Sequence, residues 1–359
     1  MKRKIRLLPV LVLAILVGWF QGCTKDPGWN DRQQDADYTT LVLKMRVSAG
    51  DTPYTRAITA QNETHVEELD VLVFSVQGDQ ERYLYHAVPE AGWSSASGSF
   101  SVKLRNREHL NDYHRIVLVA NLHDRILQLK SSFQSGVTTK AEVLEMITFT
   151  TATPWNTTGS DDFTPIPMWG ELGETVTVSP ATSSLETVTL LRALARVNVG
   201  VNFQLVGENL YQAKGLAENS DPEPFMLTGI KVYHARNIGH AAPLASVCND
   251  YIVSAPTIPQ AAVAAAPLTY TYTTPGGVLS SMNEIYIPES DNKNAGDDDK
   301  LFLLLKGYYT APGAASQNVT KESWYKVDFY DRAASGQPYE NPIDILRNHH
   351  YMVNITAVD

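Results

Sequence analysis

The sequence predicts an all-β chain, built from two tandem β-sandwiches with at most one or two short helices. After residue 37, most of the chain consists of short alternating or β-branched runs, separated by Gly, Pro, Asn and Asp. One segment, residues 138–147, places apolar residues at helical spacing instead. With 359 residues the chain is long enough for two domains of ordinary size.

The first predicted strand covers residues 38–47 (YTTLVLKMRV) and alternates apolar and polar positions. Leu41, Leu43, Met45 and Val47 fall on one face, and the residues between them fall on the other. Successive side chains of a strand point to opposite faces of the sheet, so this pattern is typical of a strand with one buried face.

Residues 69–76 (LDVLVFSV) and 115–122 (RIVLVANL) are nearly continuous apolar runs, as expected for strands inside a sandwich. A Ser-Pro-Ala-Thr-Ser-Ser turn cluster begins at Ser179, and we place the domain boundary there, giving domains 57–183 and 184–359. The other predicted strands lie at residues 100–104, 174–178, 185–201, 226–234, 284–287, 301–309, 324–330 and 351–358.

The N-terminus has the pattern of a bacterial lipoprotein export signal. A basic start precedes an apolar run at residues 7–20, which is shorter than the ~20 residues of a membrane-spanning helix. The junction Gly22-Cys23 resembles a lipobox, although Phe20 stands where Leu is usual. We therefore predict a signal peptide at residues 1–22 and lipid attachment at Cys23. The following Thr24-Lys25-Asp26 resembles the short tag that directs lipoproteins of Bacteroidetes to the cell surface.

Charge and cysteine content narrow the function further. The net charge is −10 and no basic block is present, which argues against a nucleic-acid partner. Apart from Cys23 the chain has one cysteine, Cys248. With Cys23 lipidated, no intrachain disulfide is expected, so stability must come from core burial.

The polar residues form no pattern that indicates an enzyme, and we assign no catalytic residue, cofactor or metal site. His109 and His114 lack the spacing that puts two ligands on one helix face. The adjacent His349 and His350 would face opposite sides of a strand. The acidic run at residues 291–299 has Lys and Ala where a calcium loop needs oxygen ligands, and it is more simply a solvated turn.

Five segments in order resemble the lipoprotein-derived type V fimbrial subunits of Bacteroidales, a resemblance that covers nearly the whole chain. It implies an all-β fold of two transthyretin-like or Greek-key sandwiches and a role in a surface fimbria. The segments are Arg56-Ala57 with residues 67–74 (EELDVLVF), residues 165–171 (PIPMWGE), 191–199 (LRALARVNV), 284–289 (EIYIPE) and 347–353 (RNHHYMV).

The resemblance also implies that an Arg-specific protease removes the leader, residues 23–56, by cutting between Arg56 and Ala57. That bond lies in a polar loop, residues 48–63, which a protease could reach. The cut would release the first strand and leave a groove that Leu41, Leu43, Met45 and Val47 had filled. Refilling it is worth roughly 6–12 kcal/mol before ordering costs, and a neighbouring subunit would supply the strand by β-strand addition.

The C-terminus bears on which subunit this is. The family's stalk subunits carry a donor segment after the strand that contains Tyr351, whereas this sequence ends at Asp359. We expect a weak donor or none, which favours a tip or accessory subunit. The alternative, an anchor that keeps its lipid, depends on whether Arg56 is cut.

A second alternative is a surface lipoprotein that binds glycans and does not assemble. Its 17 Tyr and 6 Trp would suit stacking on sugar rings, with Trp93, Trp155 and Trp169 in or beside turn-rich stretches.

These hypotheses together give the expected partners: other fimbrial subunits, the outer membrane through the lipid at Cys23, and a host or bacterial surface glycan or protein. The expected location is the outer membrane surface, then the fimbrium after processing.

Overall fold

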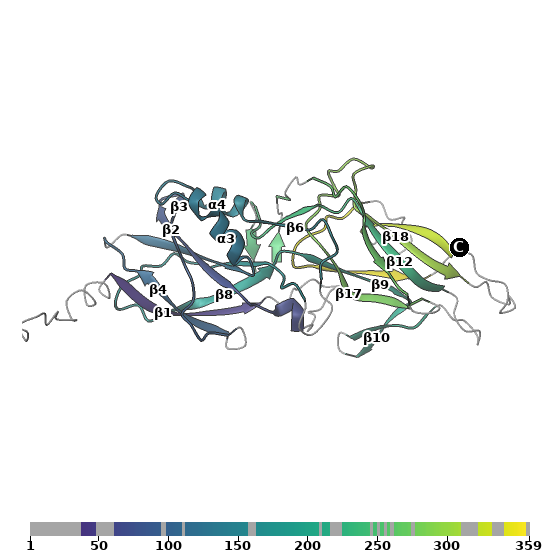
Figure 1. The fold of residues 1–359 in the computed structure, drawn as a ribbon, viewed down its shortest axis with the longest axis horizontal. Helices are drawn as coiled ribbons and strands as arrows, with labels where there is room; N and C mark the ends of the chain where they lie inside the picture. Colours follow the sequence, from purple (N-terminus) through teal and green to yellow (C-terminus); the bar gives the residue numbers. More distant parts are fainter. Residues whose placement is uncertain are drawn as a thin grey trace, which may run out of the picture.

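The computed structural model is all-β, which confirms the predicted fold class, and its two halves lie side by side along the long axis (Figure 1). Two short α-helices are present in the part of the chain that the structure describes. The described residues are 37–47, 61–94, 98–109, 112–156, 163–207, 210–215, 225–244, 247–249, 252–254, 257–258, 262–273, 277–309, 322–331 and 341–356.

The N-terminal half contains one seven-stranded sheet in the order β3-β2-β5-β7-β8-β1-β4. Side chains from β2 and from β4, far apart in this order, join one core cluster, so the sheet curves around that cluster. The strands are β1 (Tyr38–Val47), β2 (Leu69–Gln77), β3 (Gln80–Ala87), β4 (Ser99–Arg105), β5 (Tyr113–Ala120), β7 (Met168–Glu171) and β8 (Ser184–Arg192).

Two helices, α3 (His123–Leu129) and α4 (Lys140–Met146), cover the outer face of this sheet (Figure 1). The α4 helix falls inside the predicted segment 138–147 and begins with a capping box between Thr139 and Glu142. The α3 helix was not predicted; it follows β5 at Asn121, whose φ of 62° turns the chain. Since β2 and β5 lie between both cores, their apolar runs are nearly continuous. Short 3₁₀ helices are η1 (Gln61–Thr64) and η3 (Lys130–Ser132).

The C-terminal half is a two-layer sandwich around a second core. One layer has the order β17-β9-β20 and the other the order β16-β12-β18-β19, and apolar side chains from both layers pack between them. The strands are β9 (Ala195–Val201), β12 (Phe225–Tyr233), β16 (Leu268–Thr271), β17 (Ser280–Ile287), β18 (Phe302–Tyr309), β19 (Glu322–Asp328) and β20 (His350–Ile355).

The two halves are joined by backbone pairing and by one buried arginine. Strand β6 (Thr148–Thr150) pairs with β13 (Ile238–His240). Arg347, 1% exposed, donates to the carbonyl oxygens of Ala241 and Ala242 and, at 2.6 Å, to the Glu289 carboxylate. Both alanines pack in the core under α3 and α4. The hydrogen bonds of Arg347 therefore connect the C-terminal half to this core. The remaining ribbons pair β10 (Phe203–Gly207) with β11 (Leu210–Ala213), and β14 (Val247–Asn249) with β15 (Ile252–Ser254).

Two predicted strands differ from the structure. The run 185–201 is divided at Ala193 and Leu194, because β8 pairs within the first sheet and β9 within the second. The chain therefore passes from the first sheet to the second at Ala193 and Leu194, and not between residues 183 and 184. The predicted strand 174–178 makes only an isolated bridge, in which Val176 and His114 exchange backbone hydrogen bonds.

Candidate functional site

The first strand, β1, lies inside the N-terminal sheet between β8 and β4 (Figure 1). It runs parallel to β8, with Met45 opposite Val188 and Val47 opposite Leu190. On its other side it runs antiparallel to β4, where Leu43 lies opposite Phe100. β1 therefore forms a hydrogen-bonded ladder on each of its two edges, although it ends at residue 47, before all the other strands of the sheet.

The four apolar residues predicted to line the groove differ in burial. Leu41 and Leu43 are 0% exposed and Met45 is 6% exposed, and all three belong to the core cluster. Val47 is only partly buried against this cluster. The outer face is solvated: the neighbouring Val42 is 40% exposed. The predicted alternation is thus found in the structure, with three of the four side chains fully inside.

The edge strand β4 depends on β1. Within the described ranges, β1 is the one strand that pairs with β4. Met45 also donates its backbone N–H to the Gly98 carbonyl oxygen at 2.8 Å. Gly98 has a φ of 60°, and a Cβ there would lie 3.3 Å from the Met45 oxygen, so glycine suits this approach. Removal of β1 would expose an edge of β8 and leave β4 without its ladder.

The predicted processing residues Cys23, Arg56 and Ala57 lie outside the described residues. The described chain resumes at η1, where Glu63 is 2% exposed. The last residue of the predicted loop 48–63 is thus buried, and the access of a protease to the Arg56-Ala57 bond stays a prediction. Burial of Glu63 could not be predicted, because this residue is polar and follows polar residues.

Glu63 is buried because side chains from the C-terminal sheet and β8 surround it. Its carboxylate accepts hydrogen bonds from Arg192 Nη1 at 3.2 Å, from Arg196 Nη1 at 2.9 Å and from the Tyr286 hydroxyl. We call these four residues the Glu63 cluster. Burial lowers the pKa of both arginines, and the Glu63 charge opposes this shift. Burial and the same charge raise the pKa of Tyr286.

His350 lies beside this cluster, and Arg196 Nη2 donates to its ring at 3.1 Å. Burial, with the charges of Arg196 and Arg192, lowers the pKa of His350 to about 3. Its ring is therefore neutral at physiological pH and serves as a hydrogen-bond acceptor. The neighbouring His349 instead donates its Nδ1–H to the Arg347 carbonyl oxygen, 2.7 Å away, so the two histidines have different surroundings.

The tryptophans named for glycan stacking are largely engaged within the protein. Trp169 is 9% exposed and lies in the core beneath the helices. Trp93 packs beside Phe100, and Trp155 packs on Phe149 while its indole N–H donates to the Thr164 carbonyl oxygen. These contacts give the glycan hypothesis no support.

One group of side chains in the described part of the chain could bind a metal ion: Asp70, His86 and His123. Sequence reasoning considered other histidines and missed these. The three residues lie on different elements and no short motif connects them, so only the fold brings them together.

No helix in the described ranges is long and apolar enough to cross a membrane. No family model matches the sequence, and no curated protein matches it.

Solved structures do match the fold. The tip fimbrial protein Mfa3 from Porphyromonas gingivalis, in a C-terminally truncated form, is 16% identical with a TM-score of 0.51, over 90% of this chain and 96% of that one. A protein of Parabacteroides distasonis described as a cell adhesion protein is 16% identical, with a TM-score of 0.49 over 89% of this chain and 91% of that one. A fimbrial assembly protein of the same organism is 13% identical, with a TM-score of 0.39 over 88% and 90%. The resemblance seen in the sequence is thus matched by the fold.

Proposed function

We propose that this protein is a structural subunit of a cell-surface fimbria, in which a strand from a neighbouring subunit replaces β1. The observation that carries this proposal is the position of β1, which is the first described strand yet lies inside the sheet. A segment near the chain start that fills an internal groove can be exchanged without breaking the rest of the chain. β-Strand addition to the two edges it leaves is an established mode of subunit joining.

The burial of β1 sets the energy available for such an exchange. Leu41, Leu43 and Met45 are fully buried and contribute ~1.5–3 kcal/mol each, roughly 5–9 kcal/mol together. Association of two separate chains costs an estimated ~4–15 kcal/mol. A cut in the following loop makes β1 a separate chain, so this association cost then opposes its retention and weakens it. An incoming strand that buries a similar apolar face supplies the driving force for release.

The proposed route begins with export and lipid attachment at Cys23, followed by a cut between Arg56 and Ala57. The leader that leaves would contain the lipid and β1. The body that remains would begin shortly before Glu63, whose buried contacts tie η1 to β8, β9 and β17. These contacts fix η1, so a body that begins at Ala57 would keep this segment attached to both halves.

Within a fimbria we propose a tip or accessory role for this chain. The support is that the similar Porphyromonas gingivalis structure is described as a tip fimbrial protein. The alternative is an anchor subunit that keeps Cys23 and β1. Both roles begin at the outer membrane surface and have other fimbrial subunits as partners. A tip subunit moves into the fimbrium after the cut at Arg56, whereas an anchor is not cut and stays at the membrane.

Two arginine variants test the proposal in cells. Arg56→Ala removes the proposed site, and Arg46→Ala is the matched control, because Arg46 lies in β1 with its Nε donating to Thr189 Oγ1 at 3.0 Å. The measurement is the N-terminal residue and mass of surface protein and its presence in sheared fimbriae. We expect Ala57 at the N-terminus of the wild type and of Arg46→Ala, and a lipidated Cys23 in Arg56→Ala.

The outcomes separate the roles. Assembly of Arg56→Ala into fimbriae with its lipid retained would favour the anchor. A surface protein that never enters fimbriae, cut or uncut, would refute the proposed function. Loss of palmitate labelling in Cys23→Ser tests the lipid attachment independently of assembly.

A further inference from the structure

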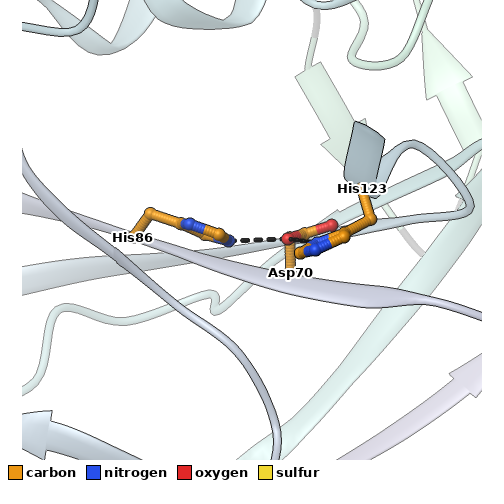
Figure 2. Close-up of side chains that lie close together, drawn as sticks. All are labelled: Asp70, His86 and His123. Atoms are coloured by element: carbon orange, nitrogen blue, oxygen red, sulfur yellow. Dashed lines mark hydrogen bonds and ion pairs between the residues drawn. The ribbon is translucent and has the colours of Figure 1, made fainter. Parts of the chain in front are cut away.

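Asp70, His86 and His123 lie together beneath the start of helix α3 (Figure 2). Asp70 is the second residue of β2, His86 is near the end of β3, and His123 is the first residue of α3. Leu72 lies directly opposite His86 in the β2–β3 ladder, so Asp70, two residues before Leu72, points to the same face. The sheet register and the turn after β5 therefore bring the three side chains together. We call them the Asp70 cluster.

The donor atoms of the Asp70 cluster converge on one point. His86 Nε2 lies 2.6 Å and His123 Nδ1 lies 2.7 Å from the same oxygen, Asp70 Oδ1. All three ligand atoms lie within 4.8 Å of one another. Tetrahedral zinc at ~2.0–2.1 Å from its ligands separates them by ~3.3 Å. The rings thus need to withdraw from Oδ1 by about 0.6–0.7 Å, which small side-chain rotations provide, to admit an ion.

The burial of Asp70 provides a second, independent observation. Its side chain is 0% exposed, and its ion-pair partners in the described part of the chain are the two histidines. The second carboxylate oxygen, Oδ2, is buried and has no hydrogen-bond partner there. A buried carboxylate usually has a cation or several donors around it, because desolvation is costly. A metal ion bound here would balance the charge of the Asp70 carboxylate and could also contact its unpartnered oxygen, Oδ2.

The electrostatic surroundings favour a cation and leave it accessible. The charges of Asp70, Glu68 and Asp124 all act on His123, so negative charge gathers at this end of the cluster. His86 is 5% exposed but His123 is 31% exposed, so one side of the cluster opens to solvent. An ion could enter there, and water could complete its coordination.

We propose that Asp70, His86 and His123 bind one divalent transition-metal ion of the zinc class. Two imidazole nitrogens and one carboxylate are a donor set typical of zinc with an open fourth position. Calcium and magnesium prefer oxygen ligands and do not fit this set. The ion would link β2, β3 and α3 on the body of the protein, so its binding does not depend on whether β1 is exchanged.

Metal titration of the full, tag-free chain tests this site directly. Zn²⁺ binding is measured by calorimetry, bound metal by mass spectrometry after dialysis, and the thermal midpoint with and without Zn²⁺. We expect one bound Zn²⁺ per chain and a midpoint that rises with its concentration, as ligand binding to the folded state requires. Co²⁺ should give the visible absorption of a low-coordinate N/O site, and Ca²⁺ or Mg²⁺ should not compete.

Three variants locate the site. His123→Ala and Asp70→Asn should each weaken Zn²⁺ binding by at least ~10–100-fold, the loss that even outer contacts of metal sites produce. The control, His109→Ala, replaces an exposed histidine outside the cluster and should bind as the wild type does. Circular dichroism checks that each variant is folded, and Asp70→Asn retains the shape of the side chain. Absence of Zn²⁺ binding by the wild type would overturn the proposal. So would folded His123→Ala and Asp70→Asn variants that bind Zn²⁺ as tightly as the wild type does.

Discussion

Replacement of Leu43 by alanine tests whether the buried face of β1 is what keeps this strand in the sheet. Leu43 is 0% exposed, lies opposite Phe100 of β4, and belongs to the N-terminal core cluster. Its neighbour Val42 is 40% exposed on the outer face of the same strand. The pair Leu43→Ala and Val42→Ala thus shares the backbone environment and differs in burial.

The expected cost follows from the side chain removed and the space it leaves. A Leu→Ala change at a fully buried position lowers the free energy of unfolding by about 2–5 kcal/mol, which combines lost transfer energy and a cavity. Val42→Ala loses little buried area and some β-propensity, so its cost should stay below about 1 kcal/mol. The difference between the two should therefore exceed about 1 kcal/mol.

Urea unfolding of the uncut protein measures both values. Trp93 lies with its ring centroid 6.3 Å from that of Phe100, so its fluorescence, isolated by comparison with Trp93→Phe, reports on this part of the core. A second measurement follows exchange: after the loop is cut, a peptide of the β1 sequence should displace β1 faster from Leu43→Ala than from Val42→Ala. Equal stability losses in the two variants would refute the idea that burial of Leu43 retains the strand.

Two further predictions concern the junction. Glu63→Gln should lower the free energy of unfolding by about 3–5 kcal/mol in urea, because it leaves Arg192 and Arg196 buried without their counter-charge; the exposed Glu67→Gln is the control, and equal small effects would contradict the reasoning. Because the pKa of His350 is lowered to about 3 from 6.5, the unfolded chain takes up a proton between these values and the folded chain does not. Stability should thus fall as the pH falls from 6.5 towards 3, and His350→Gln should flatten that slope; an unchanged slope would show that the histidine is already protonated in the fold.

Much of the fold could be predicted because burial follows simple periodicity in many strands. The alternation in residues 38–47 predicts β1 with the bounds that the structure has, and the apolar run 69–76 predicts β2 almost to the residue. Strand β3 was missed because only Tyr83 of its residues is buried, so its sequence, QERYLYHA, shows little apolar alternation. Helix α3 was missed for a similar reason: within it, Ile126 is the one buried residue.

The polar clusters could not be predicted, because they depend on contacts between distant parts of the chain. His86 and His123 are 16 and 53 residues from Asp70, and strand pairing and the turn at Asn121 bring them together. Glu63 reaches across 129 residues to Arg192. Hydrophobic periodicity predicts which face of a helix or strand is buried, but it does not predict which distant polar side chains come into contact with one another. The predicted processing site at Arg56 and the lipid site at Cys23 remain predictions.

The ladders on both edges of β1 also determine how the strand responds to mechanical load. A pull on its N-terminal end, directed along the strand, acts on the hydrogen bonds to β8 and to β4 at the same time, in shear. Such loading is resisted by all of the bonds together, whereas a pull across the strand breaks them one after another. The same strand can therefore resist tension along its axis and still yield, residue by residue, to a competing strand that enters at one end.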